Sequence, residues 1–536
     1  MENRKAEFLK TVCQVYMVSV LAVLPLYYVP WNGYYKLGDS KYYLYRNISL
    51  VCLGLCLAVV VIDAIGTRFA VNRSNRQRKD ANSQNIKRDW RGIIRNLIGK
   101  CRQHSVTTAV CIYGICAILS AICSPYGSVA WLGEREWYMG AVTICLMAGG
   151  FLLAANHGEQ CRKILLLGEA AFAAVTVIGL FQKLGYDPLG LLNGYIVGDW
   201  EYTHMLSTLG NNNWLSGYYS AMFPLSLALL QETIPNRKLL PKAVLGICNT
   251  LAVMLLLLQG SDGGVIVAGI SLWLWLWLNR NDYKNWEQML LLFAAIAVGM
   301  SIFGKMVQHV GTYDILLQDG IAKKMAVWGG WLPAAGVVLL VCVICRLTSD
   351  KMRKMLQKGI IYGSLTIAIM TILWYVYHLA GYDFTEWGNR RGMLWQMAWR
   401  GFLEGDFHQK LLGAGPDCFA SYLAEILPGG TVLFDKGYFA GAVFTNAHNE
   451  WLTTLINMGI LGVGAYLAVF ITAFRRYRDD SFAVMLLLTY GAYSLISFQQ
   501  VLNTPIFFLL LGICEAASRE HKRVCEIVPK QSEKSR

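Results

Sequence analysis

The feature that most constrains this fold is a series of apolar runs long enough to cross a bilayer. About 20 consecutive apolar residues span the hydrocarbon core as a helix, and the backbone there has to satisfy its own hydrogen bonds. Hydrophobic residues make up 55% of the 536-residue chain and charged residues only 15%, whereas a soluble protein carries roughly 25% charged residues. We therefore predict an all-α polytopic membrane protein, a single integral-membrane domain over residues 1–536.

The apolar runs predict about 14 transmembrane helices. The ranges are 8–29, 47–66, 106–123, 137–156, 162–182, 212–232, 240–258, 263–279, 286–304, 328–346, 358–380, 447–472, 482–499 and 502–517. The first run has no small-residue cleavage site after it, so it is interpreted as a transmembrane helix and not as a signal peptide. The 15 cysteines fall mostly within apolar runs or basic loops, which argues against a disulfide framework.

The distribution of positive charge predicts the topology. With alternating helices and a cytoplasmic N-terminus, most of the 48 Lys and Arg residues fall in cytoplasmic segments. We expect a multi-pass protein of the cytoplasmic (inner) membrane, with both termini in the cytoplasm and residues 518–536 as a cytoplasmic tail. The basic cytoplasmic loop 67–105 is either a contact for anionic lipid headgroups or a solvated linker. The net charge of +14 therefore reflects topology and not nucleic-acid binding.

The longest outer segment is the external loop 381–446, between the eleventh and twelfth predicted helices. Its first part predicts a helix lying along the membrane surface, residues 412–416 (LGAGP) predict a tight turn, and the following stretch predicts another helix. The loop leads to His448, at the start of the next apolar span. The positive end of a helix dipole disfavours an imidazolium, so a neutral imidazole able to accept a proton is expected there. A polar interfacial cap without chemistry is the alternative for this histidine.

Three external arginines suggest phosphate binding. Arg390 and Arg391 lie near the start of the external loop and Arg135 lies in another outer segment. The planar guanidinium fork fits phosphate oxygens. If the helices that flank the external loop are neighbours, its two ends meet, and arginines beside His448 would suit a hydroxyl nucleophile and a phosphate or diphosphate leaving group. The alternatives are anchoring on lipid phosphates for Arg390 and Arg391, and an ion pair with Glu134 or Glu136 for Arg135.

The external acidic residues do not form a metal-binding motif. Asp383, Glu386, Asp417 and Glu450 are scattered, and the sequence contains no Walker, GxSxG or HExxH pattern. We therefore expect neither a metal nor a cofactor. Because ATP is absent outside the cytoplasm, an activated donor has to arrive already energised, on a lipid.

Six short elements resemble motifs of one family. They are residues 133–140 (GEREWYMG), 186–190 (YDPLG), 209–215 (LGNNNWL), 391–395 (RGMLW), 412–419 (LGAGPDCF) and 447–462, which begins AHNEWL and ends MGILG. In this order they resemble the O-antigen ligase and O-antigen polymerase superfamily, which are membrane glycosyltransferases of the C type. The O-antigen ligase-like region covers roughly residues 124–470.

The resemblance implies a metal-independent, inverting glycosyltransferase. Members move a glycan from an undecaprenyl-diphosphate carrier to a hydroxyl of a glycan, lipid or protein acceptor at the outer face of the membrane. His448 resembles the catalytic base. Arg391 resembles the arginine that holds the diphosphate, and Arg390 would share that role. The matched elements also place Asn211, Asp417 and Glu450 among the expected substrate-binding residues.

One element departs from the family pattern. Many members carry Ser-Arg-Gly where this chain has Ser261, Asp262 and Gly263. Either a second phosphate contact comes from Arg135, Lys323 or Lys324, or this chain binds its donor in a different way from those members.

Two other classes stay open beside the glycosyltransferase. A flippase for lipid-linked oligosaccharides would need charges buried along a central path and an internal repeat, whereas the charged residues here cluster at predicted helix ends. A peptidoglycan polymerase of the shape, elongation and division type would use Asp417 or Glu450 in place of His448. The sequence does not separate a polymerase from a ligase.

Overall fold

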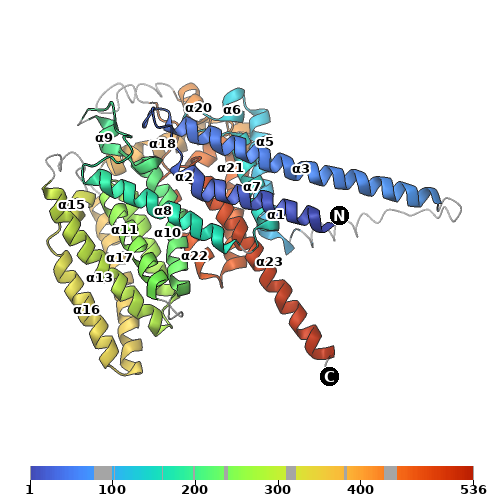
Figure 1. Cartoon of the computed structure of the whole chain (residues 1–536). Coiled ribbons are helices and arrows are strands. Elements are labelled where there is room, and N and C mark those ends of the chain that lie inside the picture. The colour runs from blue at the N-terminus through green and yellow to red at the C-terminus, as the bar shows by residue number, and fades with distance from the viewer. Residues whose placement is uncertain are drawn as a thin grey trace.

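The computed structural model describes residues 2–77, 99, 101, 103–159, 161–196, 199–233, 239–309, 321–379, 383–427 and 443–534. Most of the basic loop 67–105 lies outside the described residues, as do 428–442 of the external loop and the last two residues of the tail. The structure is a bundle of helices (Figure 1).

The helices follow the apolar runs of the sequence. In chain order, they are α1 (Glu2–Val18), the π-helix η1 (Ser19–Val23), α2 (Leu24–Leu26), α3 (Leu37–Gln77), α5 (Ser105–Cys123), α6 (Ser128–Leu132), α7 (Ala141–His157), α8 (Arg162–Lys183), α9 (Trp200–His204), the 3-10 turn η2 (Ser207–Leu209), α10 (Asn212–Thr233), α11 (Leu239–Leu258), α12 (Asp262–Leu278), α13 (Tyr283–Gln308), α15 (Ile321–Val327), α16 (Trp331–Leu347), α17 (Asp350–Leu379), the 3-10 turn η3 (Phe384–Glu386), α18 (Trp387–Glu404), α19 (Phe407–Leu412), α20 (Phe419–Ile426), α21 (Glu450–Tyr477), α22 (Ser481–Ser494) and α23 (Thr504–Lys534). Two short strands, β1 (Met205–Leu206) and β2 (Gly210–Asn211), pair antiparallel before α10.

Each of the 14 predicted ranges coincides with a helix among the described residues. Seven of the described helices are long and apolar enough to cross a membrane, and four more are apolar but shorter. The chain is therefore an all-α protein of the multi-pass membrane type. The second predicted helix, 47–66, is longer in the structure, because α3 starts at Leu37 and continues to Gln77.

Four helices from distant parts of the sequence form the framework that carries the site. The C-terminal α23 packs along α7, and α21 packs along α5 (Figure 1). α22 joins this group to α10 and α12. The external loop contributes α18, α19 and α20, which all contact α21. The first helix of the external loop, α18, thus lies against α21, the helix that follows the loop.

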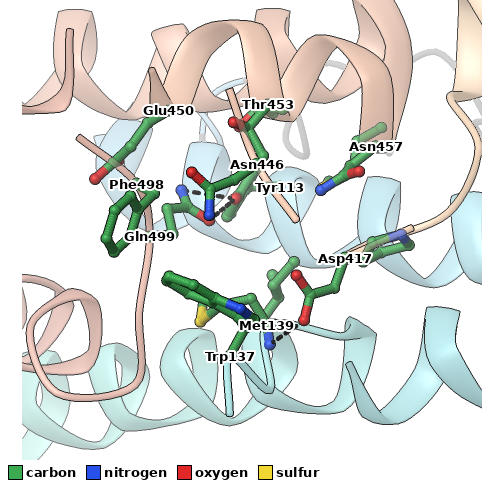
Figure 2. Close-up of a pocket in the computed structure, with 14 residues that line it drawn as sticks. Tyr113, Trp137, Met139, Asp417, Asn446, Glu450, Thr453, Asn457, Phe498 and Gln499 are labelled. Atoms are coloured by element: carbon green, nitrogen blue, oxygen red, sulfur yellow. Dashed lines mark hydrogen bonds between the residues drawn. The ribbon is translucent and has the colours of Figure 1, made fainter. Parts of the chain in front are cut away.

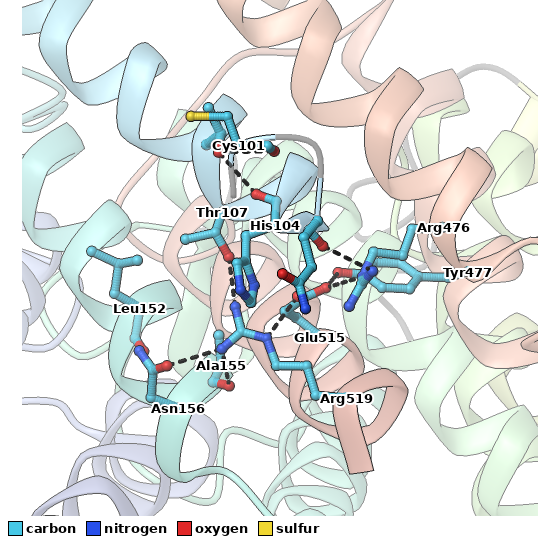
Figure 3. A network of polar contacts seen from close by, with 12 residues as sticks. Cys101, His104, Thr107, Leu152, Ala155, Asn156, Arg476, Tyr477, Glu515 and Arg519 are labelled. Carbon is cyan, nitrogen blue, oxygen red and sulfur yellow. Dashed lines mark hydrogen bonds and ion pairs between the residues drawn. The ribbon is translucent and has the colours of Figure 1, made fainter. Parts of the chain in front are cut away.

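A buried ionic network ties these helices together at the end of α21 that lies away from His448 (Figure 3). Glu515 of α23 is fully buried and binds Arg476 at 2.6 Å and Arg519 at 2.8 Å. Tyr477 donates a further hydrogen bond to the same carboxylate. Arg519 also donates to Thr107 of α5 at 2.9 Å. Because each charge has several partners, the network stabilises the contact of α21 and α23 with α5.

The prediction that charged residues stay at the ends of helices is wrong for Glu169. This residue lies within α8, is buried, and accepts a hydrogen bond of 2.6 Å from Ser226 of α10. A neutral hydroxyl partner makes such a position tolerable in an apolar bundle.

Candidate active site

His448 lies in a turn whose shape is fixed by asparagine side chains. The side chain of Asn449 accepts the N–H groups of Trp451 and Leu452, both at 3.0 Å, and so caps α21. The side chain of Asn446 accepts the N–H of His448 at 3.0 Å. His448 itself has a positive φ of 48°. A left-handed non-glycine residue costs free energy, and such residues are concentrated at functional sites.

The imidazole of His448 is held neutral. Burial lowers its pKa from the ordinary 6.5 to about 3, and the positive charge of Arg391 acts in the same direction. The ring meets Phe498 edge to face, with centroids 5.0 Å apart. Its Nδ1 is buried and has no hydrogen-bond partner in the described part of the chain. A neutral imidazole with a ring nitrogen that lacks a partner is a feature expected of a base that awaits a donor.

Arg391 reaches the same place from α18. It is half-buried, and burial lowers its pKa, while the nearby Tyr493 of α22 and Asp262 of α12 act in the opposite direction. The next residue, Gly392, allows η3 to pack against α18, because a Cβ there would overlap the carbonyl of Phe384. The packing of η3 on Gly392 thus fixes the first turns of α18 and with them the position of Arg391.

The Ser261-Asp262 position faces this arginine. Ser261 caps α12 and donates a hydrogen bond of 2.7 Å to the side chain of Asn213. Asn213 also receives the Tyr493 hydroxyl on its carbonyl at 2.6 Å, and its N–H donates to the side chain of Asn211 at 2.8 Å. The starts of α10 and α12 therefore meet the end of α22 beside Arg391. Asp262 places a negative charge near Arg391.

Arg390 is directed differently from Arg391. It has a φ of 68° and forms an ion pair of 3.5 Å with Glu386. The predicted ion pair of Arg135 with Glu134 or Glu136 is made instead with Asp39 of α3, at 3.5 Å, and the arginine side chain is 65% exposed. Lys324 lies exposed on α15, which packs on α11, α12 and α13. No contact of Lys324 with Arg391 or His448 is found among the described residues.

The two acidic candidates are both buried and hydrogen-bonded. Asp417 accepts the N–H groups of Glu134 at 2.8 Å and Met139 at 2.9 Å, and so closes the turn before α7. Burial raises the pKa of Asp417 to about 7. Glu450 accepts hydroxyl groups from Tyr466 at 2.7 Å and from Tyr490 at 3.2 Å.

A pocket lies beside the His448 turn (Figure 2). Its empty volume is about 420 Å³, including its opening to solvent. The lining residues come from α5, α7, α21, the turns before α7 and α20, the His448 turn and the segment after α22: Tyr113, Trp137, Met139, Ile144, Pro416, Asp417, Asn446, Glu450, Thr453, Thr454, Asn457, Met458, Phe498 and Gln499.

A break in α21 shapes this pocket. Gly459 has a φ of 64° and interrupts the helix. The carbonyls of Ile456 and Asn457, just before the break, accept the N–H groups of Ala414 and Gly415, both at 2.9 Å. The glycine-rich turn of the external loop is therefore docked on the kink, and Asp417 follows directly. The two family-like elements, residues 412–419 and 458–462, fit each other as one structural unit.

Sequence reasoning brought out part of this site. His448 and Arg391 come together, Asn211 lies in the network around Arg391, and Asp417 and Glu450 line the adjacent pocket. The predictions missed Tyr493, Phe498, Asn457, Gln499 and Trp137. One signal was visible, since Asn457 is a polar residue within an apolar span, and such residues are usually functional.

Comparisons with family models and with curated proteins find no match to this chain. No group of three or more His, Cys, Asp or Glu side chains able to hold a metal is found in the described parts of the chain. The arrangement therefore has to be interpreted from its own chemistry. It offers a neutral imidazole, a neighbouring guanidinium and a polar pocket next to both.

Proposed function

We propose that the protein transfers or polymerises a glycan, taking it from an undecaprenyl-diphosphate carrier and joining it to a hydroxyl acceptor at the outer face of the cytoplasmic membrane. The observation that carries this proposal is the neutral His448 beside Arg391, with a buried Nδ1 that has no hydrogen-bond partner among the described residues. The likeness of six sequence elements to the O-antigen ligase and polymerase superfamily supports the same reaction. In this proposal the chain is a member of that superfamily.

In the proposed reaction, His448 takes the proton of the acceptor hydroxyl. The hydroxyl oxygen forms a bond to the anomeric carbon of the donor sugar, and the bond from that carbon to the diphosphate oxygen breaks. Undecaprenyl diphosphate leaves with the electron pair, and Arg391 stabilises the charge on it. Attack on the face opposite the leaving group inverts the anomeric centre.

Binding of the donor changes the pKa of His448. Asp262 is the carboxylate that acts on Arg391 among the described residues, and the charge of Arg391 keeps the imidazole weakly basic. A bound diphosphate would offset the positive charge of Arg391 and so raise the pKa of His448. His448 thus becomes a stronger base when a donor is present. Because residue 262 is an aspartate and not an arginine, one guanidinium group fewer would bind the diphosphate.

The experiment is complementation of a strain that lacks the gene. Plasmids carry the wild type, His448→Ala, Arg391→Ala, or the controls His408→Ala and Arg400→Ala, which change exposed residues of the same external loop. Protein levels are matched by immunoblot, and surface polysaccharide and lipid-linked units are analysed.

We expect both site variants to accumulate short undecaprenyl-linked units, while both controls restore normal polysaccharide. Loss of long chains would identify a polymerase, and long chains left unattached would identify a ligase. Normal polysaccharide with both site variants would overturn the proposal.

A transporter of lipid-linked oligosaccharides is the second candidate. The observation that favours it is Glu169, a carboxyl group buried within the bundle between α8 and α10. Glu169→Gln distinguishes the two candidates, since a transporter that depends on this charge would lose polysaccharide export, whereas the proposed glycosyltransferase would keep its activity.

A further inference from the structure

Two residues that line the pocket of Figure 2 also contact His448. Phe498 lines the pocket and also contacts the imidazole ring. Asn446 lines it as well, and its side chain holds the N–H of His448. A group bound in the pocket therefore lies next to the base.

The lining combines aromatic rings with uncharged amides. Trp137 and Phe498 meet at a right angle with centroids 4.7 Å apart, which forms a corner against which an apolar ring face can pack. Gln499 and Tyr113 are hydrogen-bonded to each other at 3.2–3.3 Å on one wall. Asn457 stands near the opposite wall in Figure 2, beside Asp417. Donors and acceptors thus surround an aromatic corner.

Asn457 is the residue that indicates a missing ligand. Only 7% of its surface is exposed, and its side-chain oxygen has no hydrogen-bond partner in the described part of the chain. A buried acceptor without a partner costs about 1–3 kcal/mol and calls for a donor from outside the protein. A ligand hydroxyl would supply that donor.

The charge of the lining separates this pocket from the place of the diphosphate. None of the described residues that line it is Lys, Arg or His, and two are acidic. A phosphate would be repelled here, whereas an uncharged polyhydroxylated ring would find acceptors, donors and an aromatic face. Arg391 is not among the lining residues.

We propose that this pocket binds the acceptor sugar, the ring whose hydroxyl is deprotonated by His448. The inference rests on the proposed function and adds the substrate class of the acceptor, a neutral saccharide. The reaction then has two separate sites, with the donor diphosphate at Arg391 and the acceptor ring against Trp137 and Phe498.

The test is a binding titration that needs no turnover. The probe is the lipid-free repeat-unit oligosaccharide, released by mild acid from the surface polysaccharide of the wild-type strain. It is titrated against the purified full-length protein in detergent, and binding is followed by saturation-transfer NMR. The variants are Asn457→Leu and Gln499→Met, which keep side-chain size but remove hydrogen-bonding groups.

Asn249→Leu is the matched control. Asn249 lies on α11, is fully buried, and also has a side-chain oxygen without a partner in the described residues, but it does not line the pocket. We expect Asn457→Leu and Gln499→Met each to weaken binding about tenfold, as for the loss of one buried hydrogen bond, and Asn249→Leu to bind as the wild type does. In transfer assays the same two pocket variants should raise the KM for acceptor and leave the KM for donor unchanged.

Unchanged affinity in both pocket variants, with normal gel-filtration profiles, would overturn the inference, as would a wild type that does not bind the oligosaccharide. Failure of the proposed chemistry appears elsewhere, as normal polysaccharide in cells that carry His448→Ala. The two failures are therefore distinguishable.

Discussion

The dependence of kcat/KM on pH provides a quantitative test of the His448 environment, because this parameter reports the ionisation of the free enzyme. With a pKa of about 3, close to 99% of His448 is neutral at pH 5. A histidine with the ordinary pKa of 6.5 would be only about 3% neutral at that pH. The two cases differ about thirtyfold in the concentration of active base.

The assay measures initial rates of glycan transfer in proteoliposomes between pH 4.5 and 8.5, at donor concentrations well below KM. Since the unprotonated fraction rises with pH and is nearly complete above pH 5, we expect ionisation of His448 to change kcat/KM less than twofold between pH 5 and 7.5. Because the bound diphosphate raises the pKa of His448, the acidic limb of kcat should lie at higher pH than that of kcat/KM.

Asp417 is the titrating neighbour that needs a control. Its carboxyl group has a pKa of about 7 and lines the adjacent pocket, so it could add a limb of its own. Asp417→Asn removes that limb and leaves the one that belongs to His448. Glu450 is the other carboxyl group that lines the pocket, so Glu450→Gln is measured as well. An acidic limb of kcat/KM with a midpoint near 6.5 that persists in both Asp417→Asn and Glu450→Gln would refute the reasoning about the buried imidazole.

Three further predictions concern the framework and the outer charges. Glu515→Gln should lower stability by on the order of 3 kcal/mol, because two partly buried arginines lose their buried counter-charge. Glu232→Gln, in an exposed ion pair, should cost less than about 1 kcal/mol. Thermal melting followed by gel filtration compares the two variants. Gly459→Ala should abolish folded protein or activity, because a side chain at the kink would meet the Leu411 carbonyl. Gly464→Ala on the same helix has open space and should be neutral. Equal yields of folded, active protein from the two variants would contradict this. Arg135→Ala should change transfer rates less than twofold, since the exposed arginine pairs with Asp39, and a large loss would place it at the donor.

Local pattern was enough to predict the helices. Each apolar run overlaps a helix, and seven of these helices are long and apolar enough to cross a membrane, where a chain can satisfy its backbone only within the segment. That all 14 runs cross the membrane stays a prediction. The helix of the external loop is also found, as α18, although its contacts are with α20 and α21 and it buries Met393, Leu394 and Met397. The length of α3 was not predictable from hydropathy, because its polar ends are helical as well.

The site was predictable only where one residue carries the chemistry. His448 and Arg391 stood out by type and position, and their meeting followed from the packing of α18 on α21. The pairing of Arg135 with Asp39 joins segments 96 residues apart, which no local pattern encodes. The pocket likewise depends on long-range docking of residues 414–415 on the Gly459 kink. Spacing identified the glycine-rich elements but not the surface they build between them.

The most direct test of the central claim is transfer by the purified protein in EDTA. The donor is an undecaprenyl-diphosphate-linked glycan, the acceptor is the same glycan without lipid, and the readouts are release of undecaprenyl diphosphate and the anomeric configuration of the new bond. The account predicts transfer with inversion by the wild type and by Arg400→Ala, and a rate at least about 100-fold lower for His448→Ala, as for loss of a general base. Transfer by His448→Ala at the wild-type rate, or movement of the intact donor across the bilayer without transfer, would contradict it.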